Sequence, residues 1–312
     1  MDAATPEATR PFSFDTLGGR QDETLHLAAS PEAPLVLVLP ALGLRAAYYA
    51  PLVSALVREG LHAAAIDVPG HGASPVRAAR GVDWGYPEVA AHAAAARAAA
   101  CAWVPGAPVF WLGHSIGGQV ALLDSGLHPG VHGVALVASG TPFWRAWEGA
   151  AALRIRVLTT VSTALAAALG YFPGERVGFG GREARGLIRQ WAQLARTGSY
   201  MFEGFDGEAV MGAGRAPVLA LRIVGDDLAP EAAVEHALTK LRERRVVREV
   251  WEGLPSKNVH NRWPRTPEHA AARVGAFVRS VLTGELDVAP TLHAAEPVGT
   301  RALAVAAHGD LR

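Results

Sequence analysis

Short apolar runs that alternate with segments of helical pattern are the feature of this sequence that most constrains its fold. The runs occupy residues 35–39, 61–67, 109–112, 131–138 and 217–224. Runs that are apolar at nearly every position are typical of strands buried on both faces. Strands that alternate with helices indicate βαβ units. The sequence therefore predicts an α/β fold with a mostly parallel central sheet flanked by helices.

The alternation stops between residues 142 and 215. This segment contains two helical patterns, 153–169 and 185–196, and several aromatic residues. We interpret it as an inserted, largely helical cap between two parts of one core, residues 1–141 and 216–284. The period-two patterns at 12–14 and 23–27 predict an antiparallel hairpin at one edge of the sheet. The last segment, 285–312, is rich in Pro, Ala and Gly without periodicity, and we expect it to be disordered or loosely docked.

Composition excludes several classes of protein. Lysine and arginine together equal aspartate and glutamate at 29 each, and no basic stripe is interleaved with aromatics, so nucleic acid is not an expected partner. The single cysteine, Cys101, excludes an intramolecular disulfide framework, and the 12 histidines show no metal-ligand spacing. We find no signal peptide and no apolar run of about 18–20 residues, and therefore expect a soluble cytoplasmic protein without integral membrane association.

Gly113, Ser115 and Gly117 form a Gly-x-Ser-x-Gly sequence directly after the apolar run 109–112, and a helical segment, 119–123, follows. A serine on a sharp turn from strand to helix has a strained backbone, and the glycines let neighbouring chains approach it. The serine hydroxyl is then exposed at the edge of the sheet, near the amides of the helix N-terminus. The pentapeptide alone is weak evidence in a chain with 34 glycines.

Two further residues strengthen this interpretation. Asp226 follows the strand run 217–224, and His260 lies in a loop after the last predicted strand. A serine nucleophile needs a base to accept its proton, and that base needs an acid to orient it. We favour Asp226 as the acid, and its neighbour Asp227 remains the alternative. We expect His114 and His71 to have structural roles.

The order Ser115, Asp226, His260 resembles that of the α/β-hydrolase family, and the resemblance extends over residues 35–282. Residues 66–74 resemble the family's Asp-x-x-Gly-His-Gly-x-Ser turn, and residues 40–43 occupy the place of its oxyanion loop. More narrowly, the chain resembles a subgroup of predicted serine hydrolases of unsettled substrate. The resemblance implies an α/β-hydrolase fold with a cap, an oxyanion hole formed by the amides of Leu42 and Ile116, and no cofactor or metal.

Trp144 and Trp147 stand at the start of the predicted cap. They either line an acyl pocket or fill a small core within the cap, and we take both as candidate substrate-binding residues. Trp191 is expected in the core of the cap. The oligomeric state is left open.

We therefore predict a serine hydrolase that acts on an ester or related acyl bond of a fairly apolar small molecule. An acyltransferase on the same fold, or a binding module on a decayed hydrolase scaffold, is the alternative. Haloalkane chemistry is disfavoured because it requires Asp at the position of Ser115. The predicted roles are nucleophile for Ser115, base for His260 and orienting acid for Asp226.

Overall fold

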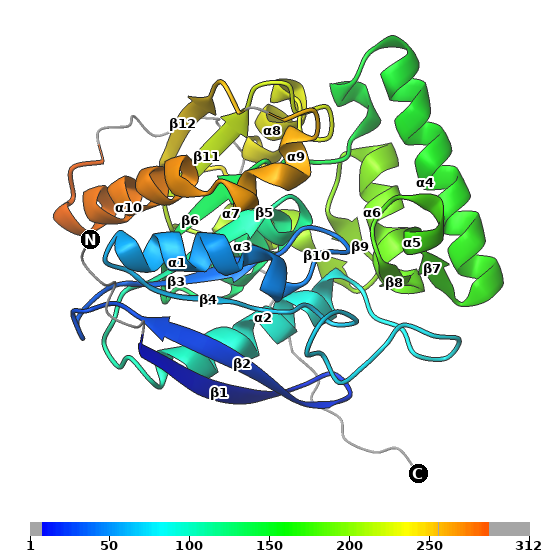
Figure 1. Ribbon diagram of the computed structural model, residues 1–312. Coiled ribbons are helices and arrows are strands. Elements are labelled where there is room, and N and C mark those ends of the chain that lie inside the picture. Colours follow the sequence, from blue (N-terminus) through cyan, green and yellow to red (C-terminus); the bar gives the residue numbers. More distant parts are fainter. Residues whose placement is uncertain (1–7, 255, 287–312) are drawn as a thin grey trace.

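An eight-stranded sheet lies between two layers of helices in the computed structural model, which describes residues 8–254 and 256–286 (Figure 1). The strand order is β1-β2-β4-β3-β5-β6-β11-β12. The strands are β1 (Ala8–Thr16), β2 (Gly19–Leu27), β3 (Leu35–Leu39), β4 (His62–Ala65), β5 (Val109–His114), β6 (Val131–Val137), β11 (Val218–Ile223) and β12 (Val246–Trp251). All neighbours from β4 to β12 pair in parallel, which confirms the predicted fold class.

The first two strands form the predicted hairpin at the edge of the sheet. β1 and β2 pair antiparallel, with Phe12 opposite Glu23 and Phe14 opposite Gln21. Phe12 and Phe14 are buried while the residues that alternate with them are more exposed, as expected for a strand with one face on the core.

Side-chain alternation along β3 explains why helices cover both faces of the sheet. Leu35, Leu37 and Leu39 pack with α2 (Tyr86–Cys101) and α3 (Ile116–Leu127), whereas Val36 and Val38 pack with α1 (Ala50–Arg58) and α10 (Glu268–Thr283). The core helices and short turns are η1 (Ala46–Tyr49), α1 (Ala50–Arg58), α2 (Tyr86–Cys101), α3 (Ile116–Leu127), α7 (Gly207–Ala213), α8 (Glu231–Leu238), α9 (Val259–Arg262), η3 (Trp263–Arg265) and α10 (Glu268–Thr283).

The segment between β6 and β11 stands at one side of the sheet, on the right in Figure 1. It contains η2 (Trp144–Ala146), α4 (Gly149–Leu169), β7 (Tyr171–Pro173), α5 (Gly174–Val177), β8 (Arg182–Ala184), α6 (Arg185–Thr197), β9 (Met201–Phe202) and β10 (Phe205–Asp206). Two small antiparallel sheets, β7 with β8 and β9 with β10, accompany the helices. We call residues 142–206 of this segment the cap. Helix α7 packs on α3 and is therefore counted with the core.

Helix α4 is the one helix among the described residues that has the length and composition of a membrane-spanning helix. Its 21 residues are long and apolar enough to cross a membrane by length and composition, with a mean hydropathy of 1.4. Arg154 and Arg156 interrupt the apolar run near its start, so a search for uninterrupted apolar residues overlooks it. The tail predicted for 285–312 lies outside the described residues from position 287 onward.

Candidate active site

Ser115 occupies the turn between β5 and α3, and its backbone is strained. Its φ of 55° and ψ of −122° lie in a region that non-glycine residues rarely adopt. Such a conformation costs on the order of 1–3 kcal/mol and persists only where the surroundings enforce it. Here the carbonyl oxygen of Ser115 accepts hydrogen bonds from Ser139 Oγ at 2.7 Å and from the Gly118 amide at 3.0 Å.

The two glycines of the motif are required by close approach of the backbone. A Cβ atom on Gly117 would lie 2.2 Å from the carbonyl oxygen of Leu39 in β3. A Cβ on Gly113 would lie 2.2 Å from Gly118 Cα. No side chain fits at these distances, so the tight turn that presents Ser115 depends on both glycines.

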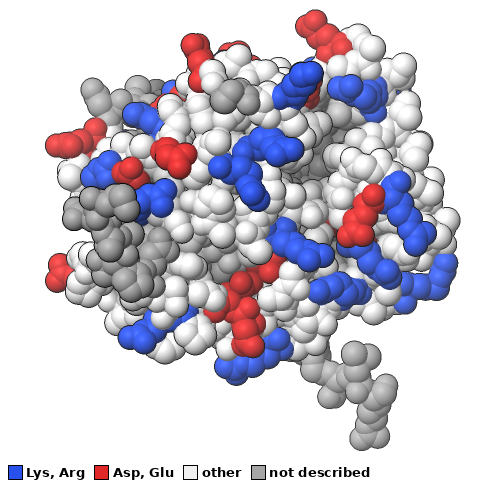
Figure 2. Space-filling view, viewed as in Figure 1, with Lys and Arg blue, Asp and Glu red and all other residues white. Residues whose placement is uncertain are grey.

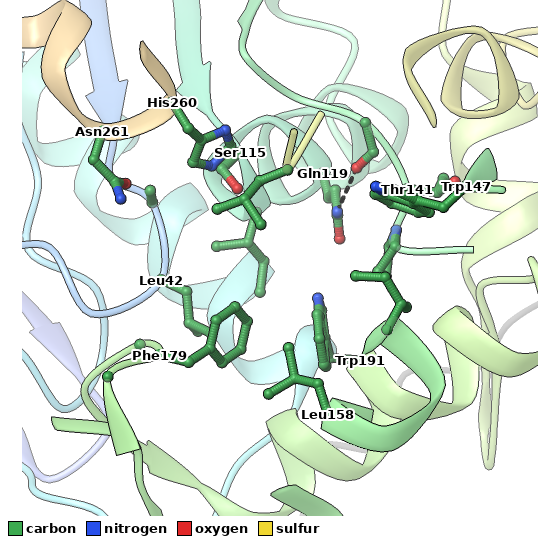
Figure 3. Close-up of a pocket in the computed structure, with 18 residues that line it drawn as sticks. Leu42, Ser115, Gln119, Thr141, Trp147, Leu158, Phe179, Trp191, His260 and Asn261 are labelled. Carbon is green, nitrogen blue, oxygen red and sulfur yellow. Dashed lines mark hydrogen bonds between the residues drawn. The ribbon is translucent and has the colours of Figure 1, made fainter. Parts of the chain in front are cut away.

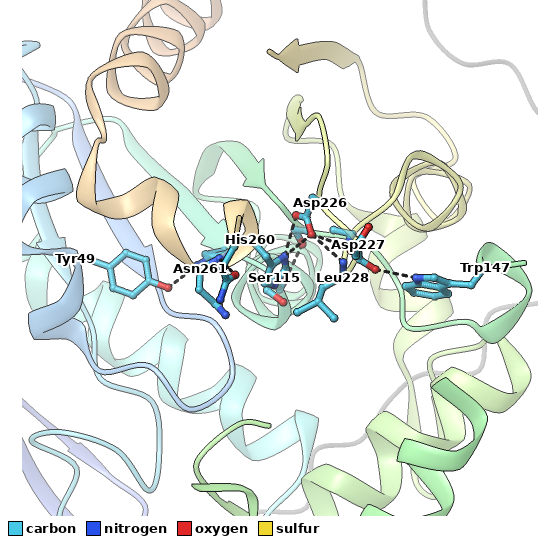
Figure 4. Close-up of polar contacts among 12 residues, drawn as sticks. Tyr49, Ser115, Trp147, Asp226, Asp227, Leu228, His260 and Asn261 are labelled. Carbon is cyan, nitrogen blue, oxygen red and sulfur yellow. Dashed lines mark hydrogen bonds and ion pairs between the residues drawn. The ribbon is translucent and has the colours of Figure 1, made fainter. Parts of the chain in front are cut away.

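His260 and Asp226 form a buried pair beside Ser115 (Figure 4). His260 Nδ1 lies 2.8 Å from Asp226 Oδ2 and 3.0 Å from Oδ1. Asp226 Oδ1 also accepts hydrogen bonds from the amides of Leu228 and Ala229, at 2.9 and 3.0 Å. These amides hold the carboxylate in place, and a proton on Nδ1 leaves Nε2 of His260 as the nitrogen able to accept another.

The structure distinguishes the two candidate acids, Asp226 and Asp227. Asp227 is exposed, and its contact with the site is made by the backbone: its carbonyl oxygen accepts a hydrogen bond from Trp147 Nε1 at 2.9 Å. Of the two carboxylates, only that of Asp226 contacts the imidazole of His260.

His114 lies behind His260 and is completely buried, with ring centroids 5.0 Å apart. Burial lowers the pKa of His114 well below 6.5, and the nearby His260 lowers it further. The His114 ring is therefore neutral. Its Nδ1 lies 2.7 Å from the hydroxyl of Tyr49, which also accepts a hydrogen bond from the Ala41 amide. These contacts connect the strand end at His114 to the loop that carries Leu42.

Leu42, in the loop after β3, and Ile116, the first residue of α3, lie next to Ser115 at the cavity. Both residues line the same cavity as Ser115 and His260. Within the described residues, neither backbone amide donates a hydrogen bond to another group.

The cavity has a volume of about 150 Å³ and lies between the core and the cap (Figure 3). Its lining is mostly apolar, with Leu42, Ile116, Trp147, Ile155, Leu158, Phe179, Trp191 and Leu228 among its residues. No aspartate or glutamate lines it in the described part of the chain.

The predicted tryptophans are placed differently. Trp147 lines the cavity, whereas Trp144 does not and instead stacks with the guanidinium groups of Arg145 and Arg156 at 5.4 and 5.2 Å. Trp144 is half-buried and packs against a small apolar cluster of Trp147, Ala152 and Ile155. Trp191, expected in the core of the cap, lines the cavity as well.

Gln119 and Thr141 line the cavity but were not predicted from the sequence. Gln119 donates from Nε2 to the carbonyl of Gly140 at 2.7 Å and accepts from the Tyr86 hydroxyl at 2.6 Å (Figure 3). Gln119 stands four residues after Ser115, so helical spacing places it on the same face of α3. This four-residue spacing could have predicted Gln119 as a residue of the site.

His71 joins the core to the cap. Its Nε2 lies 3.3 Å from Oε1 of Glu183 in β8, and both side chains are buried. Burial alone would lower the pKa of His71, but the Glu183 carboxylate and smaller contributions from Pro69 and Asp67 outweigh it, so the pKa is raised above 6.5. In the described residues, no group of three or more His, Cys, Asp or Glu side chains is arranged to hold a metal ion.

The family model described as serine aminopeptidase, S33, matches residues 30–189, which contain Ser115 and part of the cap. No curated protein matches the chain significantly.

Solved structures that resemble the chain include a thermostable carboxyl esterase from Bacillus coagulans, with 16% identity and a TM-score of 0.61 over 88% of this chain and 99% of that one. A haloalkane dehalogenase variant from Bradyrhizobium elkanii has 15% identity and a TM-score of 0.60 over 89% and 99%. A thioesterase domain from the curacin biosynthetic pathway has 16% identity and a TM-score of 0.52 over 87% and 99%. At these identities the likeness shows the α/β-hydrolase fold.

Proposed function

Because the chain belongs to the serine aminopeptidase S33 family of α/β hydrolases, we propose that it is a serine hydrolase that cleaves a carboxylic ester or related acyl bond. One observation carries the proposal. Ser115, on its strained turn, and His260, held by Asp226, line the same cavity. A serine, a histidine and a buried acid in this order are the groups that acyl transfer through an acyl-enzyme requires.

In the proposed reaction, Ser115 Oγ attacks the carbonyl carbon of the substrate and His260 Nε2 accepts the hydroxyl proton. The pair of contacts to Asp226 stabilises the imidazolium that forms. His260 then donates this proton to the leaving alkoxide, which releases the alcohol and leaves the acyl group on Ser115. Water then attacks the acyl carbon as His260 takes one of its protons. The bond between the acyl carbon and Ser115 Oγ breaks, His260 returns the proton to Ser115, and the carboxylic acid is released.

The amides of Leu42 and Ile116 are proposed to bind the oxyanion of each tetrahedral intermediate. Both residues border the cavity beside Ser115, and the Ile116 amide begins α3, where the helix dipole adds to the attraction. One such donor is worth about 3 kcal/mol of barrier in other enzymes.

The lining of the cavity favours an apolar, uncharged acyl group. An aminopeptidase substrate carries an α-ammonium group, which needs an acidic partner when it leaves water. Within the described residues no carboxylate lines the cavity, whereas Trp147, Trp191 and Phe179 do. In another protein, a cavity of about 150 Å³ accommodates a benzene ring. We therefore propose a short apolar acyl group or a small aromatic one.

A series of p-nitrophenyl esters of increasing acyl length tests both parts of the proposal. We expect kcat/KM to be highest for short acyl chains and to exceed that for aminoacyl p-nitroanilides. Ser115→Ala should lower kcat by at least about 1000-fold. Ser280→Ala is the matched control, because Ser280 lies on α10 and its hydroxyl bonds only within that helix. Full ester turnover by Ser115→Ala would overturn the mechanism, and preference for the aminoacyl anilides would overturn the substrate class.

A further inference from the structure

The outward face of α4 carries large apolar side chains that no described part of the chain covers. Leu153, Val157, Val161 and Leu169 are 59%, 53%, 49% and 41% exposed. The first three are spaced by four residues, so they form one stripe along the helix, which we call the outer stripe. Only 28% of the most apolar 18-residue window of α4 is buried. A contiguous exposed apolar surface of this kind marks an interaction site.

The opposite face of α4 is already occupied by protein. Ile155, Thr159, Ser162 and Ala166 are buried, and Ile155 also lines the cavity with Leu158. A helix with one side packed on the cap cannot be surrounded by lipid, so α4 does not span a bilayer in this structure. It can lie parallel to a bilayer surface, with the outer stripe inserted among the lipids.

The charge around the outer stripe is positive although the whole chain is neutral. Residues 142–189 contain seven arginines and three glutamates, against 29 basic and 29 acidic residues in the full sequence. Arg145, Arg154, Arg156 and Arg176 are exposed and form no ion pair with a described residue. Figure 2 shows several Lys and Arg side chains at the lower right of the molecule, with acidic side chains among them.

Trp144, the aromatic residue at the start of the cap, lies next to two of these arginines. Trp144 is half-buried, and its ring lies next to the guanidinium groups of Arg145 and Arg156. Tryptophan is enriched at the interface between membrane and water, and arginine binds the phosphates of lipid headgroups there. An apolar stripe bordered by arginines and a tryptophan is complementary to an anionic lipid surface.

We propose that the outer stripe of α4 and its neighbouring arginines dock the protein on the surface of an anionic lipid bilayer. The apolar side chains of the outer stripe enter the acyl boundary while Arg145, Arg154 and Arg156 contact headgroup phosphates. A second copy of the chain fits this face less well, because a two-fold contact would bring the same arginines of both copies together. Docking in this orientation places α4 between the bilayer and the cavity.

Co-sedimentation with lipid vesicles tests the proposal. We expect the full chain to bind vesicles of equal phosphatidylglycerol and phosphatidylcholine at low salt, and to bind pure phosphatidylcholine at least about tenfold more weakly. The double variant Val157→Glu/Val161→Glu should lose about tenfold or more in affinity for the anionic vesicles. Arg154→Gln/Arg156→Gln should lose about tenfold and show a weaker dependence on salt.

Val250→Glu is the matched control. Val250 is 47% exposed on β12 and distant in sequence from the cap, so this variant should bind vesicles as the wild type does. Thermal unfolding of each variant shows whether it is folded, and turnover of a soluble ester reports on the proposed hydrolase activity separately from docking. The proposal is overturned if the wild type binds no vesicles, if Val250→Glu loses as much affinity as the α4 variants, or if the wild type is a dimer that Val157→Glu/Val161→Glu dissociates.

Discussion

Asp226 and Asp227 show how a difference of one residue decides the chemistry of a side chain. The two carboxylates follow the same strand, but only Asp226 is buried and contacts His260. Asp227 is exposed and contacts Trp147 through its backbone carbonyl, a contact that any residue at that position retains.

We expect Asp226→Asn to lower kcat/KM for a p-nitrophenyl ester by about 10³–10⁴-fold. An amide at that position no longer stabilises the imidazolium and permits the wrong tautomer of His260. Asp227→Asn, the matched control, should change kcat/KM by less than about threefold. Steady-state kinetics of both variants at one pH distinguish the residues, and comparable losses in the two would contradict the assignment of Asp226.

The tryptophans show where residue-level prediction from sequence ends. Ser115, Asp226 and His260 each follow a predicted strand, and the carboxyl ends of parallel strands meet at one edge of the sheet, so their proximity could be predicted. Trp144, Trp147 and Trp191 belong to the cap, where no comparable rule predicts which side chains lie together. Whether each ring faces the cavity depends on how η2 and α6 pack, and that packing leaves no period in the sequence.

At the level of elements, the contact between the cap and the core depends on His71 and Glu183. Glu183 Oε1 also accepts a hydrogen bond from the Gly181 amide at 2.7 Å, so one carboxylate holds both the core turn and the cap loop that precedes β8. That loop contributes Phe179 and Gly180 to the cavity, next to Leu42. The contact between His71 and Glu183 therefore affects the shape of the cavity, although neither residue is proposed to react.

This contact should make the stability of the protein depend on pH. The pKa of His71 is raised in the folded state above its ordinary 6.5, so folding favours the protonated ring. Its contribution is complete below about pH 6.5 and is lost as the pH rises through the folded-state pKa. We expect Glu183→Gln to lower the free energy of unfolding by about 1–3 kcal/mol at pH 6 and by less at pH 9.

Urea denaturation of wild type and Glu183→Gln across this pH range measures the difference. Glu175→Gln removes an exposed glutamate from α5 of the same cap and should give a small difference that does not change with pH. A deficit in Glu183→Gln that stays constant from pH 6 to pH 9 would show that His71 does not carry the effect.

For the whole molecule, the parallel sheet and its edge hairpin could be predicted because their patterns are repeated. The run 35–39 is apolar at every position since both faces of β3 are covered, and Phe12 and Phe14 alternate since only one face of β1 is. Most of helix α4 was predicted, as the helical pattern 153–169, but its first turn was not, and two arginines in its first half obscure how apolar the whole helix is. The small sheets of the cap could not be predicted, because strands of two or three residues are too short to show a period.

The stability of the core as a whole should depend on Asp124, which is completely buried in α3. Its carboxylate contacts Arg97 of α2 at 2.8 Å, Trp111 Nε1 of β5 at 2.7 Å and His128 at 2.8 Å, so it joins two helices to the central strand. Asp124→Asn leaves the guanidinium of Arg97 without its counter-charge in a site where that side chain is only 13% exposed. We expect a loss of about 3 kcal/mol in the free energy of unfolding.

The same measurement on an exposed ion pair provides the contrast. Glu235 and Arg248 are 46% and 45% exposed, and Glu235→Gln should change the free energy of unfolding by less than about 1 kcal/mol. In urea denaturation, Asp124→Asn should lower the midpoint and keep a single transition with the wild-type slope, because α2, α3 and β5 share one core. Equal shifts in the two variants, or a separate early transition in Asp124→Asn, would show that Asp124 does not stabilise the core as one cooperative unit.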